Sequence, residues 1–166
     1  MGLDASFGLE KVVTCTTRPR RRGEEKGGYH FLSNEAFNAR VAQGEFIEWA
    51  LVYGHLYGVL KDDVLSPLAE GRSLLLLVDV QGARSLRTLF PQAWMVFIAP
   101  PDLEALVLRA SKRGVDSQRS LQRRRVEAEK EMAWAPRADF TLVNDDLARA
   151  RDQLHSALAA RLGAPL

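Results

Sequence analysis

A nearly continuous apolar run from Ser73 to Val80, interrupted only by Asp79, is the feature that most restricts how this 166-residue chain can fold. A strand with one buried face alternates apolar and polar side chains. A run without alternation is typical of a strand buried on both faces of a parallel sheet. The runs from Trp94 to Ala99 and from Phe140 to Val143 have the same character. The sequence therefore predicts three strands of a parallel sheet.

Helical patterns lie between these strands, at residues 82–90 and after the N-cap residue Asp102, and a third follows the last strand over Leu147–Leu162. Strands that alternate with helices predict an α/β fold in which a mostly parallel sheet is flanked by helices. Ligands of such sheets bind beyond the carboxyl ends of the strands. Asp79 and Asn144 are expected at such ends.

The first half of the chain has shorter elements. Strands are predicted at Val12–Thr17 and Tyr29–Leu32, with a glycine-containing loop at 20–28 between them. Ser33 is a good N-cap for the helix that follows, and residues 46–53 predict a β-hairpin that turns near Gly54.

The charge pattern favours small phosphate-bearing ligands over large polyanions. The formal net charge is only +2, but arginines cluster at 18, 20–22 and 123–125. Local arginine clusters suit phosphate groups, so no nucleic-acid partner is expected. The longest apolar run, Leu74 to Val78, is too short to cross a bilayer, so no membrane partner is expected either.

The one cysteine permits no intrachain disulfide, and no signal peptide is recognisable. Both observations predict a cytoplasmic protein. Cys15, His30 and His55 do not have the spacing of metal ligands, so no protein-held metal site is predicted.

Five side chains between residues 14 and 57 suit a phosphate group. The guanidinium groups of Arg18 and Arg21 can bind phosphate oxygens bidentately. Hydroxyls of Thr14, Tyr29 and Tyr57 can donate to the same oxygens. The alternatives are a solvated basic loop for the arginines and apolar packing for the tyrosines.

Two carboxylates are candidate site residues, and one of them could recognise a nucleobase. Strict alternation puts Glu48 on the same face of its strand as Phe46. A carboxylate among aromatic side chains can accept two hydrogen bonds from one edge of guanine, which adenine cannot donate. Asp79 interrupts an apolar strand near its end, where an unpaired charge is costly. For Glu48, the alternative is an exposed glutamate on an edge strand.

A polar, arginine-rich interval follows the helix that starts after Asp102. Its arginines could clamp phosphates during a transfer reaction, or they could lie on a solvated helix with intrahelical ion pairs. They are Arg109, Arg113, Arg123 and Arg124.

Taken in order, these motifs resemble the guanylate kinase family, a branch of the P-loop kinase superfamily, over nearly the whole chain. The segments that carry the resemblance are Thr16–Arg20, Tyr29–Phe31, Gly44–Ala50, Tyr57–Gly58, Asp79–Gly82 and Val143–Leu147.

The resemblance implies one domain over residues 1–166 with three parts. Residues 73–105 and 131–166 would form the core, 14–72 a GMP-binding insertion, and 106–130 a helical lid.

The resemblance also implies roles for individual residues. Arg18, Arg21, Tyr29 and Tyr57 would hold the phosphate of GMP, with Thr14 nearby. Glu48 would read guanine, with Asp79 beside the substrate. Arg113 and Arg124 would act in catalysis together with Asp79, and Arg109 and Asn144 would lie on the ATP side.

One departure from the family is large. The family transfers the γ-phosphate of ATP to GMP and uses a P-loop, Gly-x-x-x-x-Gly-Lys-Ser/Thr, with Mg²⁺ accompanying the ATP. This motif occurs nowhere in the 166 residues. We therefore expect a P-loop kinase-like core that lacks its first strand and helix, and strand edges that a homodimer could cover.

Two smaller departures concern the acceptor side. Val59 stands where the family usually has a serine or threonine that helps to read guanine, and Leu77 stands where it often has an aspartate. Because the P-loop motif is absent, enzymatic activity of the chain as written is uncertain. The alternative is a non-catalytic module that binds GMP or a phosphorylated protein, and Val59 also leaves open a kinase for another small phosphorylated substrate.

Overall fold

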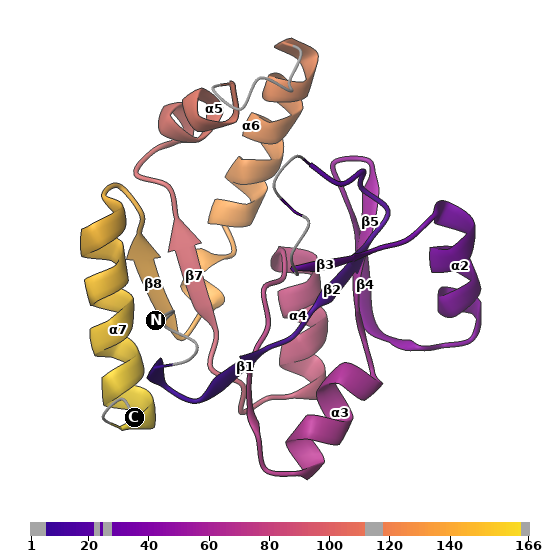
Figure 1. Cartoon of the computed structure of the whole chain (residues 1–166). Helices are drawn as coiled ribbons and strands as arrows, with labels where there is room; N and C mark the ends of the chain where they lie inside the picture. The colour runs from indigo at the N-terminus through magenta and orange to yellow at the C-terminus, as the bar shows by residue number, and fades with distance from the viewer. Residues whose placement is uncertain (1–5, 22–23, 25–27, 112–117, 164–166) are drawn as a thin grey trace. The chain divides into compact units, whose positions relative to one another are not determined.

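The computed structural model describes residues 6–21, 24, 28–111 and 118–163. The chain divides into two compact units (Figure 1). Unit 1 comprises Met1–Pro91 and Ala164–Leu166, and unit 2 comprises Gln92–Gly163. The predicted α/β class is confirmed, whereas the predicted bounds of the insertion, the core and the lid stay predictions.

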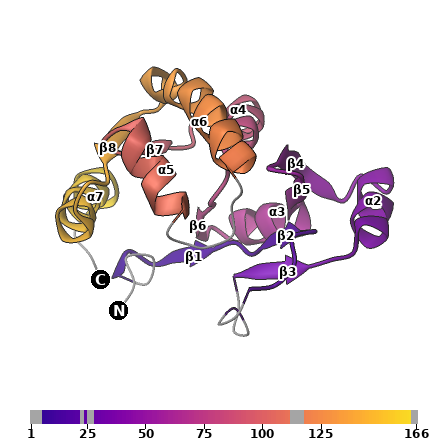
Figure 2. The same ribbon diagram turned by 90° about the horizontal axis from the view of Figure 1, so that it is seen from above.

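Unit 1 is built on a four-stranded mixed sheet with the order β3-β2-β5-β4. β3 runs parallel to β2, and β5 is antiparallel to both β2 and β4 (Figure 2). The predicted hairpin is present as β4 and β5, and it turns through Tyr53 and Gly54, whose φ angles are 49° and 85°. The strands are β2 (Thr14–Thr16), β3 (Tyr29–Phe31), β4 (Phe46–Val52) and β5 (His55–Leu60).

Helix α2 (Asn34–Ala42) covers one face of this sheet and lies beside β4 and β5 in Figure 1. Ser33 caps it as predicted, because its Oγ accepts a hydrogen bond from the Ala36 N–H at 3.1 Å. Phe37 is fully buried and stacks on Phe46, with 4.4 Å between the ring centroids. Cys15 completes the buried centre of this cluster.

A second apolar cluster of unit 1 forms around Val12, Val59 and Val64. The remaining elements of unit 1 are two strands and two helices. Strand β1 (Leu9–Lys11) pairs in parallel with β6 (Ser73–Leu75), and the helices are α3 (Asp62–Ala69) and α4 (Val80–Leu89).

The prediction of a strand over Ser73–Val80 is wrong in length, because β6 ends at Leu75. Asp79 adopts an extended backbone and its side chain caps α4, so that the helix begins at Val80. Leu77 is 57% exposed, so this part of the run is not buried on both faces.

Unit 2 contains a parallel pair of strands, β7 (Val96–Ala99) and β8 (Phe140–Val143). Its helices are α5 (Leu103–Ser111), α6 (Gln118–Met132), the 3₁₀ helix η1 (Ala135–Arg137) and α7 (Leu147–Leu162). The bounds of β8 and α7 are those predicted. None of the described helices is both long and apolar enough to cross a membrane.

Replacing Phe37 with alanine should lower the free energy of unfolding by about 3–5 kcal/mol, because the change empties a fully buried site under Phe46. Chemical denaturation measures the loss. Leu51→Ala is the matched control, since Leu51 is 60% exposed in the same unit and its change should cost less than about 1 kcal/mol. Equal losses would contradict this account of the core.

Candidate ligand-binding site

The face of the four-stranded sheet opposite α2 collects hydroxyl groups. Thr16 pairs directly with Tyr57 across β2 and β5, and Thr14 pairs with Tyr29 across β2 and β3. Directly paired residues point to the same side of a sheet, whereas Cys15 points to the α2 side. The strand register thus brings the three predicted hydroxyl-bearing residues, Thr14, Tyr29 and Tyr57, onto one face together with Thr16.

A β-bulge divides Phe46 from Glu48. The pairing of β4 with β5 shifts between these two residues, since Phe46 pairs with Leu60 and Glu48 with Val59. The extra residue reverses the alternation of faces, so Phe46 packs on α2 while Glu48 points to the hydroxyl-bearing face. The prediction that Phe46 and Glu48 share a face is therefore wrong.

Glu48 is buried, with 8% of its surface exposed, which excludes the alternative of an exposed glutamate. Its carboxylate lies against α4 at Gly82. A Cβ atom built on Gly82 would lie only 2.7 Å from Glu48 Oε2. Burial, with a smaller contribution from the negative charge of Asp79, raises the pKa of Glu48 to about 7.

Asp79 lies beside Glu48 and is held by two hydrogen bonds. Its Oδ1 accepts from the Gly82 N–H at 2.9 Å, and its Oδ2 accepts from Gln81 Nε2 at 3.1 Å. Gln81 Nε2 also donates to the Leu51 carbonyl at 3.3 Å. The amide of Gln81 therefore links the start of α4 to β4. The carboxylates of Glu48 and Asp79 lie together at one end of the polar face, where they can accept hydrogen bonds from a ligand.

Arg18 occupies the other end of this face and is 8% exposed. Nη1 and Nη2 each donate to one carboxylate oxygen of Glu24 at 3.0 Å. The guanidinium carbon lies 5.4 Å from the ring centroid of Tyr29 and 5.6 Å from that of Phe31. The pKa of Arg18 is raised, chiefly by the hydrogen bonds with Glu24, and Tyr57 adds a further hydrogen bond. Arg18 is thus a fixed cation and not part of a solvated loop.

Arg21 is exposed, but its backbone is fixed near Arg18, because its N–H donates to Glu24 Oε2 at 2.7 Å. Tyr29 is 37% exposed and meets Tyr57 edge to face, with 6.1 Å between ring centroids. The structure thus brings both tyrosines and both arginines of the prediction to one end of the site, with Thr14 buried on the same face.

Glu24, Gln81 and Gly82 contact site residues in ways that we did not predict. Glu24 is a single acidic residue in a basic, glycine-containing loop, and its position three residues after Arg21 is the only signal in the sequence. Gly82 was visible as a glycine at the start of a helix, but the approach of Glu48 depends on tertiary structure.

The residues predicted on the ATP side belong to unit 2. Arg109 Nη2 donates to the Asp145 carbonyl at 3.3 Å, and Asn144 is half-buried at the carboxyl end of β8. The backbone of Arg124 lies in α6, but its side chain and the whole of Arg113 lie outside the described residues.

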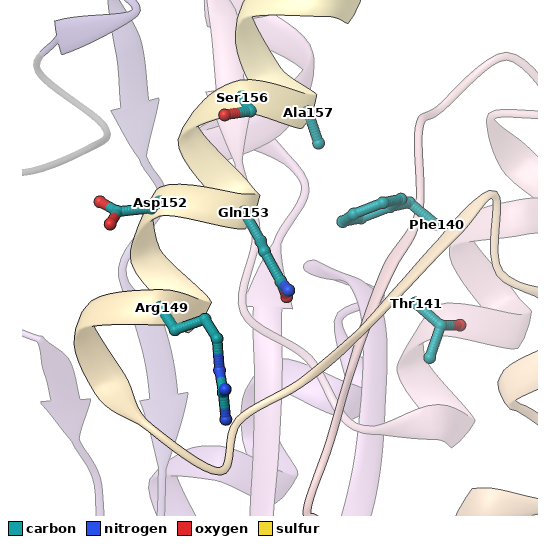
Figure 3. A pocket seen from close by; sticks show the side chains of 7 residues that line it. All are labelled: Phe140, Thr141, Arg149, Asp152, Gln153, Ser156 and Ala157. Atoms are coloured by element: carbon teal, nitrogen blue, oxygen red, sulfur yellow. The ribbon is translucent and has the colours of Figure 1, made fainter.

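A hollow of about 850 Å³ lies in unit 2 between α7 and β8. Figure 3 shows Gln153 extending from α7 toward the strand that carries Phe140 and Thr141, whereas Asp152 points away from it. None of the predicted site residues lines this hollow, so it is not the candidate site. Within the described parts of the chain, no three His, Cys, Asp or Glu side chains are grouped as metal ligands.

Comparison with known proteins gives a consistent result. The family model described as guanylate kinase matches residues 3–161. The guanylate kinase of Symbiobacterium thermophilum is 43% identical over 154 residues, which cover 92% of this chain and 73% of the relative. That of Dechloromonas aromatica is 42% identical over 161 residues, which cover 96% and 80%. The crystal structure of guanylate kinase from Anaplasma phagocytophilum superposes with a TM-score of 0.77 at 30% identity, covering 96% of this chain and 80% of that one.

The raised pKa of Glu48 predicts a pH-dependent contribution to stability. Between about pH 7 and pH 4.5, the folded state holds a proton on Glu48 that the unfolded state releases. The contribution of Glu48 to the free energy of unfolding should therefore rise as the pH falls through this range, by at most about 3 kcal/mol. Denaturation curves of the wild type and of Glu48→Gln measure it as the difference between the two proteins. A pH-independent difference would contradict the burial of an uncompensated carboxylate.

Replacing Gly82 with alanine should destabilise the protein by about 1–3 kcal/mol, because the new methyl group would collide with Glu48. Glycine to alanine in a helix normally stabilises it by up to about 1 kcal/mol, so the sign of the change is diagnostic. The double variant Gly82→Ala with Glu48→Ala should recover part of the loss, since the close approach to Val78 Cβ at 3.0 Å stays. A stabilised single variant would show that the carboxylate does not lie against α4.

Proposed function

The chain belongs to the guanylate kinase family, and from that premise we propose that unit 1 binds GMP as a phosphate acceptor. The family reaction transfers the γ-phosphate of ATP to GMP and yields ADP and GDP. The observation that carries the proposal is the pair of buried groups at the two ends of one polar face, Arg18 at one end and Glu48 at the other.

The base end suits guanine. An ionised Glu48 accepts hydrogen bonds from the two adjacent donors on the guanine edge, and Asp79 offers further acceptor oxygens. A buried acceptor left unpaired by adenine is the source of discrimination. Val59 lies directly opposite Glu48 and is 1% exposed, so it adds burial but no hydrogen bond. We therefore expect recognition of guanine that depends more on the carboxylates than in relatives with a hydroxyl at this position.

The phosphate end suits a monophosphate. Arg18 and Arg21 supply positive charge, and Tyr29, Tyr57 and Thr14 supply hydroxyl donors. The arginine fork and its aromatic neighbours are already in place without a ligand, so little ordering is required on binding.

We further propose that phosphoryl transfer by these 166 residues alone is very slow. The sequence contains no P-loop, and phosphoryl transfer depends almost wholly on positioning and charge stabilisation. The loss of a single stabilising donor typically costs about 10² to 10³ in rate, and the P-loop supplies several. Under this proposal Arg113, Arg124 and Asp79 act in catalysis, and Arg109 and Asn144 contact ATP, only when a donor segment is present.

Mg²⁺ would enter with ATP. The described residues contain no group of three His, Cys, Asp or Glu side chains that could hold a metal ion, and Leu77 carries no ligand. We therefore assign no step to a protein-held magnesium ion.

A non-catalytic role remains the second candidate. The buried Arg18 with its aromatic neighbours suits any phosphate monoester, including that of a phosphorylated protein. Preference for a phosphorylated peptide over GMP would favour this role, and preference for another nucleotide would favour a different small substrate.

Calorimetric titration of the chain tests the proposal. We expect binding of GMP, at least tenfold weaker binding of AMP, and no heat from ATP with Mg²⁺. Glu48→Gln should remove most of the preference for GMP over AMP, whereas Glu45→Gln, on a neighbouring half-buried carboxylate paired with Arg40, should leave it unchanged.

Two outcomes would contradict parts of the proposal. Absence of GMP binding would overturn the acceptor site. Binding of ATP together with phosphoryl transfer would show that another segment replaces the P-loop. An in-frame strand, glycine-rich loop and helix upstream of the first codon would assign the donor half to the same polypeptide.

A further inference from the structure

Glu24 joins the two arginines at the phosphate end. Its carboxylate forms a bidentate pair with Arg18, whose side chain is 9% exposed, and its own side chain is 28% exposed. Oε2 also accepts the backbone N–H of Arg21 at 2.7 Å. One carboxylate therefore sets both the orientation of the first guanidinium and the path of the backbone that carries the second.

Glu24 and Pro19 accept hydrogen bonds from the Nη1 and Nη2 groups of Arg18. Nη1 donates to the Pro19 carbonyl at 2.8 Å and to Glu24 Oε2, and Nη2 donates to Glu24 Oε1. A guanidinium has five N–H donors. The Nε–H and the second Nη2–H form the side-on edge, which neither Glu24 nor Pro19 occupies, and this pair has the spacing that two phosphate oxygens accept.

The aromatic rings fix the plane of the same group. Tyr29 and Phe31 lie 5.4 and 5.6 Å from the guanidinium carbon, so rotation of the side chain would break both cation–π contacts as well as the ion pair. Arg18 is consequently held in one orientation before any ligand arrives.

We propose that Glu24 is a positioning residue for the acceptor phosphate, because it holds one edge of Arg18 and turns the opposite edge toward the ligand. This inference deepens the proposed function and rests on it. Glu24 and Pro19 accept from the end-on edge of the guanidinium, which Nη1 and Nη2 form. The phosphate would accept from the side-on edge, which Nε and Nη2 form. Glu24 therefore does not compete with the phosphate for the side-on edge.

The test compares GMP with guanosine, which differ only in the phosphate. The quantity measured by calorimetry is the ratio of the two affinities in the wild type, Glu24→Gln and Glu24→Ala. We expect both variants to lower this ratio roughly tenfold, because the charge-assisted bidentate pair is lost. Guanosine affinity and the melting temperature should stay close to those of the wild type. Glu24→Asp should restore part of the ratio, because it retains the carboxylate.

Glu45→Gln is the matched control, since it breaks another ion pair of unit 1, between Arg40 and Glu45 at 2.6 Å. It should leave the ratio unchanged. An unchanged or increased ratio in Glu24→Gln would overturn the inference alone and identify the carboxylate as neutral or as a competitor. Parallel losses of guanosine affinity and melting temperature would reduce Glu24 to a structural residue. A wild type that binds neither GMP nor guanosine would overturn the proposed function and this inference together.

Discussion

One extra residue in β4 decides which side chains of unit 1 meet. With strict alternation, Phe46 and Glu48 would lie on the same face, and either the carboxylate would enter the apolar cluster under α2 or the phenyl ring would leave it. The bulge lets Phe46 stack on Phe37 while Glu48 lies against Gly82 on the opposite face. The apolar centre and the polar face of the sheet thus depend on the same irregularity.

The two buried charged groups on the polar face are stabilised in different ways. Arg18 is paired with Glu24 and flanked by two rings, so it remains ionised although it is buried. Glu48 has a carboxylate neighbour and no cation among the described residues that contact it, so burial raises its pKa to about 7. A group in this state gains most from a ligand that donates hydrogen bonds to it. The phosphate end is therefore pre-organised by the protein, whereas the base end is completed by the ligand.

The parts that the sequence predicted well are those that local rules determine. Ser33 and Asp102 cap their helices, and Phe140–Val143 is a strand, because each depends on neighbouring residues alone. The length of β6 was not predictable from apolar character, since Asp79 begins a helix where the run suggests a strand. The bulge was not predictable from a period of two. The contact of Glu24 with Arg18 depends on how the loop folds back, which composition does not encode. Recognition of Arg18, Glu48 and Asp79 as site residues came from chemistry and from the order of motifs, and their burial or hydrogen bonding supports it.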